Sequence, residues 1–257
     1  MLLNTDSSYS IYNSKHTINS NLIFKKSIEM SPIKTLETLY SMIQYTTIFL
    51  TLHKIEYCII SGTLLGCVRH QGIIPWDNDL DIMIFKEGYD KLLTVMDSFN
   101  TSKISIINCT PGFKIFYNNV SYGELFVYDY NSEEECYMLA YPYVNDTPTF
   151  LTSAIYFDWL RYPKDIIFPL APIPFEDFAV YGPNNIIGML KINYPKSNIL
   201  ECIHNPSHND THTLINKSAY KFLSTIEKKV SCKLLLFIYI IIHRFAKYKM
   251  AHNYSWF

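Results

Sequence analysis

The chain has 257 residues, 49% of them hydrophobic and 16% aromatic, which is enough to bury a sizeable core in one large domain or two small ones. The 22 basic and 23 acidic residues leave a net charge of −1, and no basic stripe runs along the chain, so we exclude nucleic acid as an expected partner. Six cysteines are spread out without a C-x-x-C pair, which favours reduced thiols over a zinc site or a disulfide framework.

Residues 1–30 are rich in Ser, Asn and Thr and are predicted to form a flexible arm. No apolar segment of signal-peptide length follows Met1, so a cytoplasmic or membrane-peripheral location is favoured and the compartment is left open. In a chain of this composition many N-x-S/T sequons are accidental, and they occur at Asn100, Asn108, Asn119, Asn145, Asn209, Asn216 and Asn253.

The first predicted helix begins with Ser31 as N-cap and Pro32 at the first helical position. Apolar residues then recur at three- and four-residue intervals toward His53, so one stripe of this helix is expected to be buried. The stripe consists of Ile33, Leu36, Tyr40, Ile43, Thr47 and Leu50.

The stretch 59–85 combines features of a site for phosphates and a metal ion. An apolar, strand-like run leads to Gly62 and Thr63, and residues 64–69 fit a short helix. A small residue lets the backbone approach an anion, and the unpaired N–H groups of a helix start bind phosphate oxygens. We therefore expect Gly62 and Thr63 to contact phosphate, with the basic pair Arg69 and His70 nearby.

An acidic run follows directly. Asp79 and Asp81 open an apolar, β-branched segment that is typical of a strand, and residues two apart on a strand project to one face. Carboxylates at this spacing suit Mg²⁺ or Mn²⁺ held together with substrate phosphates. The alternative is a turn with solvated carboxylates. Pro75 and Trp76 before the run and the apolar strand after it favour the metal, because the three Asp residues, Asp77 included, would repel one another without a compensating charge.

Alternating helices and strands continue after Phe85. A helix is predicted from Glu87 past Met96, followed by strands at 104–109 and 113–117 on either side of a Pro-Gly turn. This alternation indicates a mixed α/β layer. The next strand, 123–129, places Glu124 among apolar residues, where burying a carboxylate is costly without a nearby cation. Asp129 is the fallback candidate, or a surface charge at the strand end.

The motif G-T-L-L-G-x-V-R-H-x-G-I-I-P-W-D-x-D-L-D-I, at residues 62–82, resembles the signature of the LicD/fukutin family. That family includes bacterial phosphocholine transferases and a fukutin-related ribitol-phosphate transferase. The resemblance implies a nucleotidyltransferase-type α/β fold, a mixed sheet flanked by helices, with two strand aspartates and a third carboxylate on a later strand as metal ligands. Glu124 matches that third position, which is usually Asp. Asn78 stands where Asp is frequent, between the residues that share a face.

A second block resembles the same family. Residues 168–185 alone indicate only a rigid, proline-rich connector, and Asn184 or Asn185 is predicted to cap a helix at 186–192. The family usually has Tyr-Gly or Phe-Gly after this helix, whereas this chain has Tyr194-Pro195. His204, His208 and His212 have the spacing of a helical zinc site, but Pro206 interrupts the helix, which favours a polar loop.

The C-terminal part, 218–257, is predicted to be mostly helical. Its centre at 234–242 is apolar all round and too short to cross a hydrocarbon core of about 30 Å. It is expected to pack on the domain, with peripheral membrane contact through 234–249 as the alternative. Residues 31–217 form the expected LicD-like catalytic domain.

These parts predict a phosphotransferase. Asp79, Asp81 and Glu124 would bind Mg²⁺ or Mn²⁺, Arg69 would bind the phosphates, Asp77 would orient the network, and a carboxylate would accept the proton of the attacking hydroxyl. The resemblance implies transfer of a phospho-alcohol from a CDP-alcohol donor to a glycan acceptor, with release of CMP. Two alternatives remain open: a nucleotidyltransferase that releases pyrophosphate, and a non-catalytic glycan-binding relative.

Overall fold

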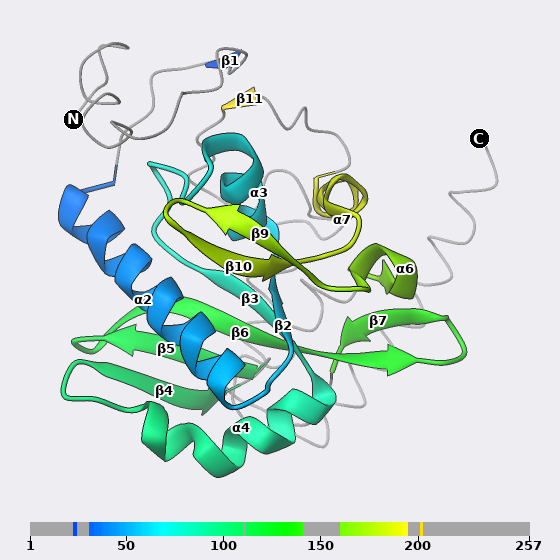
Figure 1. The fold of residues 1–257 in the computed structure, drawn as a ribbon, viewed down its shortest axis with the longest axis horizontal. Helices are drawn as coiled ribbons and strands as arrows, with labels where there is room; N and C mark the ends of the chain where they lie inside the picture. The colour runs from blue at the N-terminus through cyan, green and yellow to red at the C-terminus, as the bar shows by residue number, and fades with distance from the viewer. Residues whose placement is uncertain (1–22, 25–30, 110–111, 141–159, 195–200, 203–257) are drawn as a thin grey trace, which may run out of the picture.

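In a computed structural model of the chain, residues 23–24, 31–109, 112–140, 160–194 and 201–202 are described. They build a seven-stranded mixed sheet with the order β2-β3-β6-β5-β4, extended by β7 on β6 and β8 on β7 (Figure 1). The strands are β2 (Tyr57–Ile59), β3 (Asp81–Phe85), β4 (Ile104–Cys109), β5 (Gly112–Tyr117), β6 (Val120–Asn131), β7 (Cys136–Leu139) and β8 (Tyr162–Pro163). The predicted mixed α/β class is therefore confirmed.

The pairing of β3 with β6 is parallel, whereas β2–β3, β5–β6 and β4–β5 are antiparallel. Asp81, the first residue of β3, is the register partner of Glu124 on β6. The strand begins at Asp81 and not at Asp79, so Asp79 lies on the approach to the sheet. Ile82, Met83 and Ile84 have no exposed surface, as expected of a strand covered on both faces.

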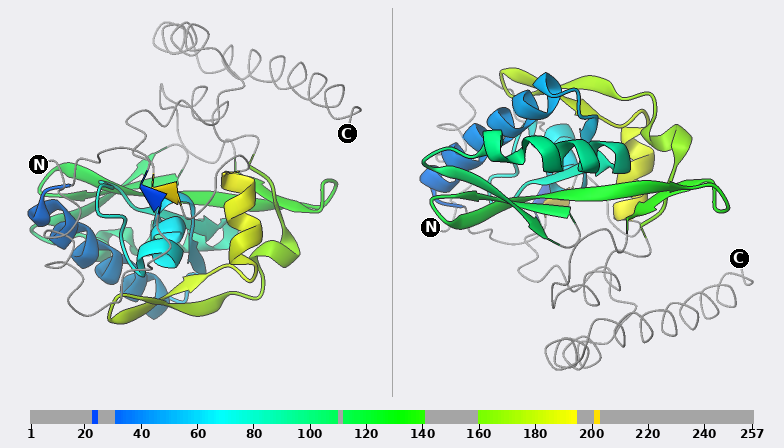
Figure 2. Two further views of the ribbon diagram at one scale, coloured as in Figure 1. Left: turned by 90° about the horizontal axis from the view of Figure 1, so that it is seen from above. Right: turned by 90° about the horizontal axis from the view of Figure 1, so that it is seen from below.

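Helices α2 (Ile33–Leu52) and α4 (Lys86–Phe99) lie on the same side of the sheet (Figure 2). The predicted helix at 31–50 is confirmed, but its N-cap is Pro32, and the Ser31 hydroxyl instead donates to the Asp77 carbonyl at 2.7 Å. Ile33, predicted to be buried, is 59% exposed, and the first buried residue of the helix is Leu36. Leu36, Ile43, Thr47 and Leu50 are buried as predicted.

The predicted strands at 104–109 and 113–117 correspond to β4 and β5. Helix α7 (Ile186–Asn193) is capped by Asn185, whose side chain accepts from the Gly188 N–H at 2.8 Å, as predicted. The connector prediction for 168–185 was wrong in part, because β9 (Ala171–Phe175) and β10 (Phe178–Gly182) form an antiparallel hairpin there, after the short helix α6 (Lys164–Ile167). Proline is tolerated in such an edge hairpin, where the missing N–H is not needed by a neighbouring strand.

At the boundaries of the domain, β1 (Ile23–Phe24), within the predicted arm, pairs in parallel with β11 (Glu201–Cys202). The rest of the arm, the histidines at 204–212 and the predicted helix at 218–249 lie outside the described residues. None of the helices in the described ranges is long and apolar enough to cross a membrane. Among the described cysteines, Cys58, Cys67, Cys109 and Cys136 are free.

Candidate active site

The turn from β2 into helix α3 (Ser61–His70) forms one wall of the site. Ser61 has a left-handed backbone with φ of 46°, and Gly62 follows it. A Cβ built on Gly62 would lie 3.0 Å from Asp77 Oδ2 and 3.6 Å from Asp81 Oδ2. Glycine therefore leaves space for the Asp77 carboxylate, which a side chain at this position would crowd, while Asp81 Oδ2 lies at an ordinary contact distance.

Asp81 is held against this turn by three hydrogen bonds. Its backbone N–H donates to Thr63 Oγ1 at 2.8 Å, and its carbonyl accepts from the Ile60 N–H at 3.1 Å. Its carboxylate Oδ2 accepts from the Gly62 N–H at 3.2 Å. The two residues predicted to contact phosphate, Gly62 and Thr63, thus fix Asp81, and a phosphate role for them stays a prediction.

Asp77 belongs to a loop that several elements hold in place. Its N–H donates to the Ile74 carbonyl at 2.9 Å, and its Oδ1 accepts from the Asn78 N–H at 3.0 Å. Ser31, just before α2, adds a bond to the Asp77 carbonyl. Burial raises the pKa of the Asp77 carboxyl well above its usual range, and the Asp79 charge raises it further.

Asp81 lies at the centre of the negative charge. Burial raises the pKa of its carboxyl well above the usual range, and repulsion from Asp79, Asp77 and Glu124 adds to the shift. We call these four residues, Asp77, Asp79, Asp81 and Glu124, the carboxylate cluster. The sequence predicted that all four belong to one site, and in the structure Asp77, Asp79 and Glu124 lie within electrostatic reach of Asp81.

The donor set of the carboxylate cluster fits a hard divalent cation, because oxygen ligands at a buried, mutually repelling position are those that Mg²⁺ and Mn²⁺ prefer. Among the described residues, however, no three Asp, Glu, His or Cys side chains stand in a ready coordination geometry. Repulsion between Asp81 and three neighbouring carboxylates shows that negative charge is concentrated around Asp81. Metal binding by Asp79, Asp81 and Glu124 stays a prediction.

Arg69 and His70, the basic pair at the end of α3, have different surroundings. The Arg69 charge lowers the pKa of Asp77, which places the guanidinium within electrostatic reach of the cluster. His70 is 8% exposed, its ring lies edge-on to Trp76 at 5.2 Å, and its Nδ1 accepts from Arg69 Nε at 3.3 Å. Burial and the Arg69 charge lower the pKa of His70 to about 3, so it is neutral at physiological pH. These are the contacts of a packing residue.

Asp129, the fallback for Glu124, is five positions further along β6. An odd separation turns its side chain to the opposite face of the strand, about 16 Å away. The alternation of β6 therefore favours Glu124 over Asp129 as a neighbour of Asp81.

Three residues near the carboxylate cluster, Asn193, Tyr194 and Lys114, were not predicted from the sequence. Asn193 on α7 donates from Nδ2 to Ser61 Oγ at 3.0 Å, and its Oδ1 accepts from the Tyr162 hydroxyl at 2.8 Å. Burial raises the pKa of the Tyr194 hydroxyl, and the nearby charges of Asp81 and Asp77 raise it further. Lys114 pairs with Glu124. The one available signal was Lys114, a cation in the otherwise apolar and aromatic strand Gly112–Tyr117.

A mixed sheet with acidic residues at the start of β3 and on the parallel neighbour β6, beside a glycine turn, defines a nucleotidyltransferase-type domain. Residues 54–185 match the family model described as LicD/FKTN/FKRP, nucleotidyltransferase domain. The match covers more than half of the chain, and the chain belongs to this family.

Similar proteins include both named and uncharacterized ones. Uncharacterized protein RP689 of Rickettsia prowazekii is 32% identical over 197 residues, 75% of this chain and 64% of that protein. Human ribitol 5-phosphate transferase FKRP is 25% identical over 166 residues, 64% of this chain and 32% of that protein. Lipopolysaccharide cholinephosphotransferase LicD of Haemophilus influenzae is 42% identical over 43 residues, 17% of this chain and 16% of that protein.

The chain spans less than two thirds of the length of the rickettsial relatives that it matches, 64% of RP689 and 54% of RT0683 of Rickettsia typhi. A solved structure of the antibiotic-resistance factor ANT(2'')-Ia is similar with a TM-score of 0.43 and 11% identity, covering 85% of this chain and 99% of that one.

Proposed function

We propose that the chain is a metal-dependent phosphotransferase that moves a phospho-alcohol from a CDP-alcohol donor to a hydroxyl of a glycan, releasing CMP. One observation carries the proposal: the carboxylate cluster surrounds Asp81 beside Gly62, in a chain of the LicD/FKTN/FKRP family. Two members similar to this chain are named as a ribitol 5-phosphate transferase and a cholinephosphotransferase. Neither of these two names shows which alcohol phosphate this chain would transfer.

Asp79, Asp81 and Glu124 would hold Mg²⁺ or Mn²⁺, which when bound neutralises the donor diphosphate and favours in-line attack at phosphorus. The chain's own groups then supply the remaining steps. Thr63 and the Gly62 N–H keep the Asp81 carboxylate in a fixed position. Arg69 adds positive charge for the phosphates near Asp77.

The acceptor hydroxyl must lose a proton as it attacks phosphorus. A carboxylate serves best as the base when its pKa lies close to the working pH, because it is then both ionised and basic. Burial and the neighbouring Asp79 charge raise the pKa of Asp77, which favours Asp77 as the base. The proton passes to a carboxylate oxygen, the new P–O bond forms to the sugar oxygen, and the bond to CMP breaks.

The test is product analysis. The protein is incubated with Mg²⁺, a glycan acceptor and a panel of CDP-alcohols that includes CDP-choline and CDP-ribitol, and CMP is measured by chromatography. CMP release that depends on acceptor and on Asp81 supports the proposal. Pyrophosphate release from a nucleoside triphosphate would show a nucleotidyltransferase instead, and unchanged donor turnover in Asp81→Asn would contradict a role of the cluster.

A further inference from the structure

A cross-strand row extends the carboxylate cluster to a third strand. Asp81 on β3 is the register partner of Glu124 on β6, and Glu124 is in turn the register partner of Lys114 on β5. Register partners on neighbouring strands project to one face of a sheet. Two carboxylates and an ammonium group therefore stand side by side on the same face, in an order that the sheet fixes.

The ion pair at the end of this row is short and open to solvent. Lys114 Nζ lies 3.1 Å from Glu124 Oε1, and the two side chains are 43% and 31% exposed. An exposed pair of this kind contributes little to stability. Fold stability alone therefore gives little reason for a lysine in this strand, and the position of the pair next to Asp81 is its distinguishing feature.

Two members of the carboxylate cluster, Asp77 and Glu124, each have a cationic side chain nearby. On the α3 side, Arg69 is close enough to Asp77 to lower its pKa. On the β5 side, Lys114 contacts Glu124. Such an arrangement suits a ligand that carries negative charge on two adjacent groups, because each cation can receive one of them. A lysine ammonium is a compact point charge that binds phosphate oxygens well.

We propose that Lys114 is a phosphate-binding residue of this site, recognising the diphosphate group of the substrate while Glu124 keeps its ammonium in position. The ligand class is a diphosphate or a diphosphate ester. This assignment deepens the proposed function but does not depend on CDP-alcohols as donors, because the diphosphate is shared with pyrophosphate and with nucleoside triphosphates.

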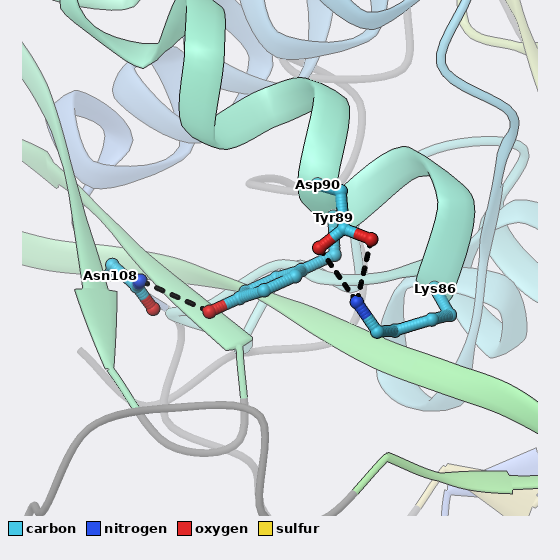
Figure 3. A network of polar contacts seen from close by, with 4 residues as sticks. All are labelled: Lys86, Tyr89, Asp90 and Asn108. Carbon is cyan, nitrogen blue, oxygen red and sulfur yellow. Dashed lines mark hydrogen bonds and ion pairs between the residues drawn. The ribbon is translucent and has the colours of Figure 1, made fainter.

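The chain offers a matched control. Lys86 Nζ lies 2.6 Å from Asp90 Oδ1, four residues further along α4, and contacts the face of Tyr89 (Figure 3). It is another partly exposed lysine–carboxylate pair, with lysine and aspartate side chains 20% and 65% exposed, and it involves no residue of the carboxylate cluster. Lys86→Met removes the same charge from the chain without touching the row on β3, β6 and β5.

The experiment measures binding of magnesium pyrophosphate by isothermal titration calorimetry at low salt. Lys114→Met is expected to raise the Kd about tenfold or more, Lys114→Arg to keep it within about threefold, and Lys86→Met to leave it unchanged. Thermal unfolding of each variant within a few degrees of the unsubstituted chain shows that the fold is intact.

An equal Kd for the unsubstituted chain and Lys114→Met overturns the proposal, and so does the absence of pyrophosphate binding by the unsubstituted chain. An equal loss in Lys114→Met and Lys86→Met also overturns it, because the effect would then come from net charge. The proposed function fails separately: if binding follows Lys114 as expected but no CDP-alcohol yields CMP, the diphosphate site stands and the CDP-alcohol reaction does not.

Discussion

Asp81 combines strong fixation with unfavourable electrostatics. Three hydrogen bonds hold it, while burial and three neighbouring carboxylates oppose its negative charge. Natural sites keep such groups when function needs them, at a cost in stability. The same residue is therefore expected to limit the stability of the metal-free chain and to be essential for turnover.

We predict that Asp81→Asn stabilises the metal-free chain by about 1–2 kcal/mol at pH 7 and lowers turnover by at least about 100-fold. Because folding raises the pKa of Asp81, its contribution to stability is complete below the unfolded value near 4 and is lost as pH rises through the folded value. The advantage of Asn over Asp should accordingly grow with pH above 4. Urea unfolding of both proteins between pH 4 and 8 measures it, and a constant difference would contradict the prediction.

The pH dependence of stability expected for His70 has the opposite sign to that expected for Asp81. Its pKa is lowered from 6.5 to about 3, so the stability that it contributes as a neutral ring is complete above 6.5 and is lost as pH falls toward 3. His70→Asn keeps an acceptor for Arg69 Nε but does not titrate. We predict that the stability difference between the two proteins shrinks below pH 6.5, by up to about 1.4 kcal/mol per pH unit. Urea midpoints at pH 7 and pH 5 test this, and turnover at pH 7 should change far less than in Asp81→Asn.

At the scale of elements, the end of α7 is joined to the start of α3. Asn193, 4% exposed, bridges Ser61 on α3 and Tyr162 on β8. Ser61 holds a left-handed backbone conformation that costs free energy for a residue other than glycine. The bridge from Asn193 therefore helps to keep the turn beside Gly62 in the form against which Asp77 and Asp81 rest.

Asn193→Ala removes both bonds and is predicted to cost about 1–3 kcal/mol of stability and to lower kcat/KM about tenfold or more, because the glycine turn loses its support. Tyr162→Phe is the matched control, since it removes the bond to Asn193 Oδ1 and leaves the bond between Asn193 and Ser61. Unfolding by urea and CMP release measure the two effects. Equal losses of turnover in both variants would show that α7 acts on general stability and not on the turn.

At the scale of the whole molecule, stability and ligand binding are coupled through the sheet. The carboxylate cluster draws on the loop before β3, on β3 itself and on β6, and its repulsion acts on the folded state alone. A cation that binds only the folded chain stabilises it by an amount that depends on its excess over Kd.

We predict that Mg²⁺ at about 100 times its Kd stabilises the chain by about 2.7 kcal/mol, which is roughly 5–10 °C in Tm for a domain of this size. Addition of EDTA should reverse the shift. Asp81→Asn should show a much smaller one, measured by differential scanning fluorimetry under the same conditions. A Tm that does not respond to Mg²⁺ or Mn²⁺ in the unsubstituted chain would contradict metal binding by the cluster.

Local sequence patterns were sufficient to predict the features that depend on residues close together in the sequence. The apolar run after Asp81 predicted strand β3, the Asn185 cap predicted the start of α7, and the motif at residues 62–82 predicted the family. The boundary errors are equally local. Ile33 has the spacing of the buried stripe but precedes Leu36, the first buried residue of α2, and residues 171–182 pair with each other despite their prolines.

The sequence by itself determined the acidic run, the glycine beside it and the strand on which Asp81 stands, because these features depend on residues fewer than twenty positions apart. Only the tertiary structure decided how distant groups come together at the site. The parallel register of β3 and β6 sets Glu124 beside Asp81, the antiparallel register of β5 adds Lys114, and α7 brings Asn193 to Ser61. Such contacts depend on sheet register and helix packing. These result from many small free-energy contributions over the whole core, so no single stretch of sequence encodes them.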